Sequence, residues 1–295
     1  MALKKVKAFV LLTLLSAACS LNAQILNGSF DANSTLPASW QIDHNGVLPE
    51  IRQSFSTAEQ PYSSSKYPPI IIQPVGDSQY FALLRSDSRD HVATRRDSFG
   101  RIVDFCQISQ TITVRAGQYI TGEYFFSTGD YLPYNDMAII KLVPDPCSDP
   151  ADFNEILLAQ KNVADVGDFQ TMAGWETFIY DFNEAKAGTY TLILQVEDVG
   201  DDKWTSRLAV DALKIECSYE LAGDINSDCV VDFYDFAILA NQWLNECIAP
   251  TWCNNADINP LPEGNKVNFS DVMILAEHWL IDCGVIPLDT ACESQ

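Results

Sequence analysis

The chain has 295 residues, of which 47% are hydrophobic, and its 18 Lys and Arg against 40 Asp and Glu give a formal net charge of −22 at pH 7. A surface of this charge repels nucleic acid and anionic lipid, so electrostatic binding to either is excluded. Beyond the N-terminal segment, no stretch is apolar over the roughly 18 residues that a membrane-spanning helix needs. We therefore expect no nucleic-acid partner and no membrane span.

Residues 1–23 have the pattern of a secretory signal peptide. Three lysines precede an apolar run from Ala8 to Leu15, which is too short to span a bilayer. The small residues ending at Ala23 form an acceptable cleavage site, whereas the segment before Cys19 is a poor lipobox. Cleavage after Ala23 is therefore favoured over lipidation of Cys19, and the protein is expected to be secreted, extracellular or at the cell surface.

Residues 24–216 are expected to form an antiparallel jelly-roll sandwich. Short runs rich in Val, Ile, Thr, Tyr and Phe are separated by turn residues, with no amphipathic helix between them. Two polar segments, 52–78 and 85–105, are expected to be long loops. The predicted strands cover 80–84, 110–114, 119–126, 137–143, 175–180, 188–196 and 207–215.

Three segments of this region resemble the galactose-binding-like jelly rolls, a fold shared by many carbohydrate-binding modules. They are the opening Asn27-Gly-Ser-Phe-Asp31, the following Leu36-Pro-Ala-Ser-Trp40 and the closing strand Ser206–Ile215. The resemblance spans Gln24 to Glu216 and implies binding of polysaccharide. Sugar faces stack on exposed aromatic rings while polar side chains accept hydroxyl hydrogen bonds, and the candidate residues are Tyr131, Tyr134, Asn135, Asp136 and Trp175.

Other interpretations of the sandwich stay open. The aromatic side chains could instead pack a loop onto the sheets. Asp130 and Asp136 could hold a structural calcium ion. A glycan hydrolase or lyase needs two carboxylates that face each other across a cleft, and Glu123 and Glu176 on predicted strands are the pair to consider. We expect no catalysis, because nearly any acidic protein offers such a pair.

The cysteines indicate disulfides, which persist in oxidising compartments. Without Cys19 eight remain, two in the middle of the chain and six after residue 216, which suggests two separately stapled domains. Six cysteines permit 15 pairings, so the connectivity stays open. A zinc site is disfavoured because no CxxC pair occurs. The candidates are Cys106, Cys147, Cys217, Cys229, Cys247, Cys253, Cys283 and Cys292.

Residues 217–295 contain an internal repeat, in which Val231–Leu244 aligns with Val267–Leu280 at a constant offset of 36. Lys266 is the one Lys or Arg of this region among many Asp and Glu, which favours a bound cation. Before the first copy, oxygen ligands fall at positions 1, 3, 5, 7, 9 and 12 of a calcium loop, the seventh being a main-chain carbonyl. These residues are Asp224, Asn226, Asp228, Val230, Asp232 and Asp235.

A second loop before the other copy is three residues too long for the same pattern. Its insert removes the Asp expected at position 5, where Glu263 or Asn265 is the replacement, so weaker calcium binding is expected. A solvated acidic loop is the alternative. The predicted ligands are Asp257, Asn259, Glu263, Asn268 and Asp271.

The first loop and its helix resemble a dockerin module. Asp235 stands where EF-hands usually have Glu, and the helix Phe236–Leu244 follows it. The resemblance covers Ala222 to Leu280 and implies two F-hand motifs, calcium-dependent folding and docking onto a cohesin-like or other envelope protein. Phe233-Tyr234 and Phe269-Ser270 replace the Ser-Thr pair common in cellulosomal dockerins, which puts recognition by a cohesin in doubt.

Two details of this module are expected to matter for its folding. Cys229 occupies position 6, where Gly is usual, and a left-handed residue with a Cβ costs about 1 kcal/mol or more. A disulfide to Cys247 or Cys253 is expected to hold that turn. The apolar stripes of the two helices are expected to form a small core by packing against each other. Their members are Phe236, Leu239, Trp243, Val272, Leu275 and Trp279.

These patterns together predict a mainly β protein with three segments: a signal peptide (1–23), a galactose-binding-like sandwich (24–216) and a small all-α dockerin-like EF-hand pair (217–295). The expected function is non-catalytic: calcium-dependent docking combined with carbohydrate binding, in polysaccharide binding or degradation. A dockerin-bearing glycan hydrolase or lyase, and a structural component of the cell envelope or matrix, are the alternatives.

Overall fold

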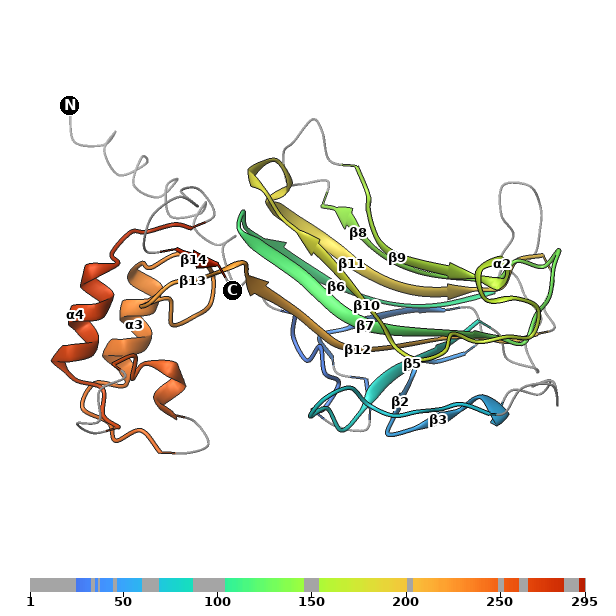
Figure 1. Ribbon diagram of the computed structural model, residues 1–295, viewed down its shortest axis with the longest axis horizontal. Coiled ribbons are helices and arrows are strands. Elements are labelled where there is room, and N and C mark those ends of the chain that lie inside the picture. The colour runs from blue at the N-terminus through green and yellow to red at the C-terminus, as the bar shows by residue number, and fades with distance from the viewer. Residues whose placement is uncertain are drawn as a thin grey trace, which may run out of the picture.

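The computed structural model describes residues 25–32, 35–36, 38–44, 47–59, 69–86, 104–145, 154–200, 204–248, 252–259, 265–283 and 292–294. The expected signal peptide, Cys147 and Glu263 lie outside these residues. Figure 1 shows two parts, a large β-sandwich and, beyond the end of strand β12, a smaller part with helices α3 and α4. Within the described ranges, no helix is long and apolar enough to cross a membrane.

The large part consists of two five-stranded sheets in which every pairing is antiparallel. The first sheet has the order β1 (Gln41–His44), β6 (Phe105–Val114), β11 (Gly188–Glu197), β8 (Met137–Pro144) and β9 (Ile156–Asn162). The second has the order β10 (Glu176–Asp181), β7 (Gln118–Thr128), β12 (Ser206–Cys217), β5 (Phe81–Arg85) and β2 (Glu50–Arg52). The chain crosses repeatedly between the sheets, as in a jelly roll.

Short elements complete the fold. Strands β3 (Phe55–Ser56) and β4 (Ile71–Ile72) pair with each other, as do β13 (Tyr219–Glu220) and β14 (Glu293–Ser294). The helices are η1 (Thr57–Glu59), α2 (Val163–Val166), η2 (Glu184–Lys186), α3 (Phe233–Asn241), η3 (Trp252–Asn255) and α4 (Phe269–Glu277).

The core of the sandwich follows from alternation along the strands. In β11, Tyr190, Leu192 and Leu194 are fully buried while the residues between them are partly exposed, because successive side chains point to opposite faces. Strand β5 is buried on both faces, since the indole of Trp175 covers Phe81 at a ring-centroid distance of 5.6 Å. In a strand that is buried on one face, apolar and polar residues alternate, whereas β5 is a nearly continuous apolar run.

The seven predicted strands overlap observed ones, and the mainly β, antiparallel sandwich is confirmed. Strand β1 was not predicted because all four of its residues are exposed and carry no apolar alternation. The segment predicted as a loop from 52 to 78 instead contains η1 and the β3–β4 pair, whose Phe55 and Ile72 join the core.

The helical part has its own core, in which Leu239 of α3 and Leu275 of α4 are buried. Disulfides join Cys217 to Cys229, Cys247 to Cys253 and Cys283 to Cys292. Each closes a loop of at most 12 residues, so local chain geometry decides the pairing. The expectation that Cys229 pairs with Cys247 or Cys253 is wrong.

Cys106 does not form the disulfide expected for the middle of the chain. It is a free thiol, fully buried in the sandwich core on β6. Burial raises its pKa to about 12, because the thiolate would lose its hydration. Cys106 therefore acts as a small apolar core residue.

Gly28 is needed where the N-terminal segment crosses β12, because a Cβ at this position would collide with the main-chain carbonyl of Leu213. Gly28→Ala is therefore expected to lower the free energy of unfolding by about 3 kcal/mol, measured by urea denaturation with far-UV circular dichroism. Gly174→Ala is the matched control, since nothing lies within 4 Å of its added Cβ. Equal stability of the two variants would refute this account of the N-terminal motif.

Candidate functional site

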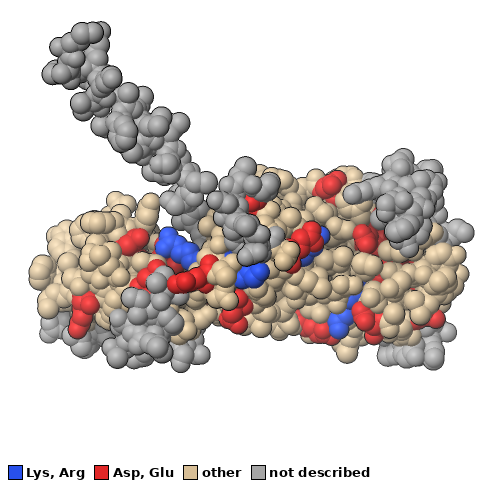
Figure 2. All heavy atoms as spheres, turned by 90° about the horizontal axis from the view of Figure 1, so that it is seen from above, with Lys and Arg blue, Asp and Glu red and all other residues tan. Residues whose placement is uncertain are grey.

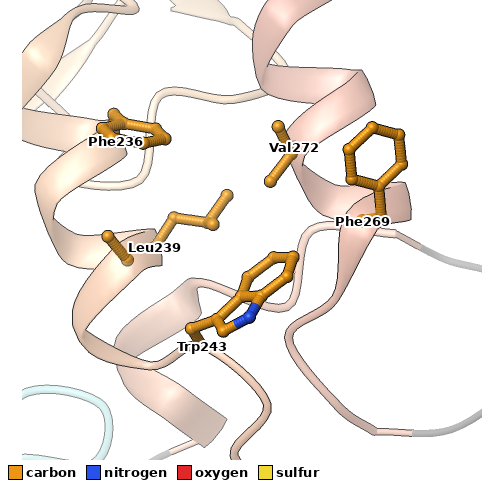
Figure 3. Close-up of a pocket in the computed structure, with 6 residues that line it drawn as sticks. Phe236, Leu239, Trp243, Phe269 and Val272 are labelled. Atoms are coloured by element: carbon orange, nitrogen blue, oxygen red, sulfur yellow. The ribbon is translucent and has the colours of Figure 1, made fainter.

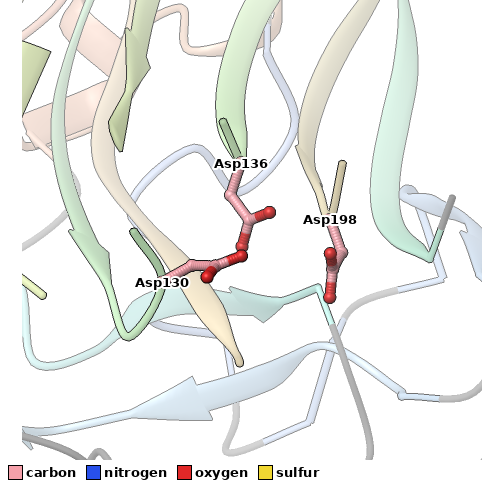
Figure 4. A group of neighbouring side chains, drawn as sticks. All are labelled: Asp130, Asp136 and Asp198. Carbon is pink, nitrogen blue, oxygen red and sulfur yellow. The ribbon is translucent and has the colours of Figure 1, made fainter. Parts of the chain in front are cut away.

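Three carboxylates meet beneath the loop that joins β7 to β8. Asp130 follows β7, Asp136 precedes β8 and Asp198 follows β11; all three are fully buried. Their ligand atoms lie within 4.8 Å of one another, and Figure 4 shows the side chains facing each other from three segments. Carboxylate oxygens are hard ligands, so the donor set fits a divalent cation such as calcium.

Strand register explains how this triad assembles. Glu197 of β11 pairs with Met137 of β8, which places the next residue, Asp198, beside Asp136. Asp198 was missed from sequence because its partners lie more than sixty positions away in the chain. The acidic residues that follow β11 were the one signal in the sequence for this site. They do not indicate that β8 is the neighbouring strand.

The local electrostatics favour protonation or a cation at Asp136. Burial raises the pKa of Asp136 well above its ordinary value, and the charge of Asp130 raises it further. Hydrogen bonds oppose this rise: the Ser206 hydroxyl donates to Asp136 Oδ2 over 2.7 Å, and the Val199 amide donates to Oδ1 over 2.9 Å.

The loop above the triad carries two of the predicted sugar-binding tyrosines. The rings of Tyr131 and Tyr134 meet edge to face with centroids 5.5 Å apart, and Tyr131 also lies 5.3 Å from Phe169. The Leu132 amide donates to Asp168 Oδ1, and the Phe169 amide donates to the Asp130 carbonyl. These contacts fix the loop, and Tyr131 keeps 36% of its surface exposed.

The other predicted sugar ligands do not join this pair on the surface. Asp136 is fully buried and belongs to the triad. Asn135 Oδ1 accepts the Ala164 amide at the first turn of α2. Trp175 lies on the core, where its indole N–H donates to the Gln73 carbonyl and its ring contacts Phe81 and Phe125. For Trp175, packing onto the sandwich is therefore the observed role.

The pair considered for a glycosidase does not have the geometry that this chemistry requires. Glu176 pairs with Tyr124 and Thr177 with Glu123 in the β10–β7 register, so Glu123 and Glu176 project from opposite faces of one sheet. Glu176 accepts the Tyr124 hydroxyl and pairs with Lys161 at 3.0 Å. These two carboxylates do not face each other across a cleft.

In the helical part, the first predicted calcium loop curls around its own carboxylates. Asp224 accepts the amides of Asp228 and Cys229, over 3.0 and 2.8 Å. Asp235 Oδ1 accepts the amides of Ile225 and Asn226, over 2.7 and 3.1 Å. The hydrogen bonds to Asp235 join this loop to the first turn of helix α3.

Cys229 has a positive φ of 73°, as expected for position 6 of such a loop. Because the left-handed conformation is costly for a residue with a Cβ, the disulfide to Cys217 is positioned to hold this turn.

Burial raises the pKa values of the carboxyl groups in this loop. Burial, with the charges of Asp235 and Asp228, raises the pKa of Asp224 to about 7. Burial also raises the pKa values of Asp228 and Asp235. Among the described residues, the 4.8 Å three-way approach of carboxylates is seen in the sandwich triad rather than here. The loop carboxylates instead hold main-chain amides.

The second loop repeats this arrangement despite its insert. Asp271 Oδ1 accepts the amides of Ile258 and Asn259, both over 2.9 Å, as Asp235 does in the first loop. Burial and the charge of Asp271 raise the pKa of Asp257. Asn268 caps α4.

The two halves of the repeat also pair crosswise. Val231 exchanges main-chain hydrogen bonds with the segment after α4, at Leu280 and Ile281. Val267, its counterpart 36 residues later, does the same with Leu244 and Asn245 after α3. Each loop is therefore stabilised by the end of the other helix.

An apolar groove of about 450 Å³ lies between α3 and α4 (Figure 3). The expectation that both apolar stripes close on each other is only partly right: Leu239 and Leu275 are buried, but Phe236 and Trp243 are each 42% exposed. Large apolar side chains left open to water mark interaction surfaces. The groove is lined by Phe236, Leu239, Ala240, Trp243, Phe269 and Val272.

No protein-family model and no curated protein matches the sequence. Among solved structures, the chain is similar to the carbohydrate-binding module TmCBM61 in complex with β-1,4-galactotriose, with a TM-score of 0.35 and 13% identity over 67% of this chain and 99% of that one. It is also similar to the K1 cleaved adhesin domain of Lys-gingipain from Porphyromonas gingivalis W83, with a TM-score of 0.35 and 13% identity over 66% and 99%.

A third similar structure is the CBM22-1 xylan-binding domain of Paenibacillus barcinonensis Xyn10C, with a TM-score of 0.32 and 11% identity over 67% of this chain and 97% of that one. TM-scores of this size carry no inference about a ligand. The β-sandwich is established by the strand order of this chain itself.

The raised pKa of Asp136 predicts how stability depends on pH. A carboxyl group whose pKa is higher in the folded than in the unfolded chain binds its proton more tightly when folded. With a chelator present, lowering the pH from neutrality toward the ordinary pKa of a carboxyl group therefore adds stability through Asp136, and Asp136→Asn removes this contribution. Urea denaturation at each pH measures the difference. Asp43→Asn, at an exposed position of β1, is the control; identical profiles for the wild type and Asp136→Asn would contradict the prediction.

Proposed function

We propose that this chain is a secreted, non-catalytic binding protein with two modules. The C-terminal region (217–295) is a calcium-dependent, dockerin-like docking module. The sandwich (24–216) is a galactose-binding-like module that binds polysaccharide. The observation that carries the docking role is the open apolar groove between two helices that start from matching acidic loops. The three disulfides agree with an oxidising, extracellular location.

The partner that we propose for the groove is a cohesin-like domain with an apolar ridge and a basic rim. Phe269, which lines the groove, is 68% exposed, and Phe233 at the start of α3 is 73% exposed. Residues 217–295 contain thirteen Asp and Glu against Lys266 alone, so a complementary partner carries positive charge beside its apolar contact. Phe233 stacks edge to face on Trp279 at 4.9 Å, which joins the start of α3 to a residue packed against the module core.

Calcium is the cation that best fits the two loops. The first provides carboxylate, amide and carbonyl oxygens from Asp224, Asn226, Asp228, Val230, Asp232 and Asp235. Burial raises the pKa values of Asp224, Asp228 and Asp235, and a divalent cation would offset this cost of keeping the carboxylates charged. When bound, calcium would neutralise these charges. The second loop offers Asp257, Asn259, Asn268 and Asp271, with lower ligand charge.

The sandwich is proposed to bind neutral polysaccharide at the Tyr131 and Tyr134 loop. The two rings form a fixed, partly exposed aromatic surface on a loop held by hydrogen bonds. The net charge of −22 repels uronic-acid and sulfated polymers, which leaves neutral chains as the favoured class.

Docking is tested with immobilised cohesin domains and the full chain, by biolayer interferometry. Binding is expected with calcium and not with a chelator. Phe269→Ala, which removes an exposed ring and leaves the core intact, is expected to weaken binding about tenfold. Tyr131→Ala, in the sandwich, is the control. Failure of every cohesin to bind in calcium would rule out this docking role.

Polysaccharide binding is tested by affinity electrophoresis of the full chain in gels that contain neutral glycans. Tyr131→Ala and Tyr134→Ala are each expected to weaken binding about tenfold, because stacking on the sugar face is lost. Phe269→Ala, an exposed aromatic residue of the other module, should bind as the wild type does. If neutral glycans do not retard the protein, or if the tyrosine variants bind equally well, the proposed sugar site is wrong.

A further inference from the structure

An arginine of the sandwich reaches into the first acidic loop of the helical part. Arg115 lies in the turn between β6 and β7, and its Nη2 is 3.2 Å from Asp228 Oδ2. Asp228 is the fifth position of the predicted calcium loop. Figure 2 shows basic and acidic side chains lying together where the two parts of the molecule meet.

Both ends of this ion pair are held in place by other contacts. In the turn, the Arg115 amide donates to Gln118 Oε1 over 2.8 Å, and the Gly117 amide donates to the Phe182 carbonyl over 2.8 Å. The Ser218 amide, just after β12, donates to the Gly117 carbonyl over 2.8 Å. The turn is therefore fixed to the start of the helical part.

On the loop side, the Cys217–Cys229 disulfide joins the last residue of β12 to the residue after Asp228. Asp228 Oδ1 accepts the Val230 amide over 3.2 Å, which leaves Oδ2 directed at Arg115. The Asp228 side chain is 13% exposed and the Arg115 side chain 40%, so water screens the pair from the arginine side only.

We propose that Arg115 determines the cation affinity of the first loop, because its guanidinium occupies the Asp228 oxygen that a bound cation requires. A cation that enters the loop must break this ion pair and then remains near the guanidinium charge. Arg115 thereby lowers affinity, and it links cation binding to the contact between the sandwich and the docking module. The inference rests on the proposed calcium function of this loop.

The test is calorimetric titration of the full, chelator-treated chain with CaCl2 at low ionic strength. Arg115→Gln is expected to tighten binding about threefold to fivefold at one site, and Arg115→Lys to change it less, because the charge is retained. Lys141→Gln is the matched control: it makes the same change in net charge on β8, where Lys141 pairs with Glu155. Circular dichroism in chelator confirms that each variant is folded.

Loss of one calcium site in Asp224→Asn identifies which titrated site is the first loop. If that site is present and Arg115→Gln binds no more tightly than Lys141→Gln, the role of Arg115 is overturned while the calcium site stands. Weaker binding by Arg115→Gln would also overturn it, since Arg115 would then organise Asp228 for the cation. If Asp224→Asn titrates as the wild type does, the proposed calcium function of the loop fails as well.

Discussion

The removal of carboxylates from water is the constraint on which the rest of this structure depends. Asp130, Asp136 and Asp198 in the sandwich, and Asp235 and Asp271 at the helix starts, are all fully buried. Burying a charge is costly unless hydrogen bonds, protons or cations compensate for it. Local hydrogen bonds offset this cost. Main-chain amides donate to Asp235 and Asp271, and a hydroxyl group and an amide donate to Asp136.

The same constraint orders a loop in both parts. In the acidic loops, each closing carboxylate takes part in the capping box of its helix and accepts the loop amides, so one side chain orders both the loop and the helix start. In the sandwich, Asp130 and Asp136 of the buried triad lie in the same loop as Tyr131 and Tyr134, so the loop that carries the aromatic pair also brings two of the buried carboxylates together.

The small size of the helical part explains why its apolar residues divide between core and surface. Two helices of nine residues cannot enclose all of their large side chains. Leu239 and Leu275 fill the centre, three disulfides supply further constraint, and Phe236 and Trp243 stay open along the groove. The groove is therefore lined by apolar side chains that the small core does not enclose.

Local patterns in the sequence determined the β-rich region, its seven main strands, the internal repeat and the left-handed turn at Cys229, because each depends on residues close together in the chain. Tertiary structure alone decided the rest. The register of β11 with β8 brought Asp198 to Asp136, the opposite faces of one sheet separated Glu123 from Glu176, and the β6–β7 turn placed Arg115 on Asp228. The residues in each of these pairs are between about fifty and more than one hundred positions apart in the chain. Local periodicity does not predict which strands become neighbours, so the sequence did not indicate these arrangements.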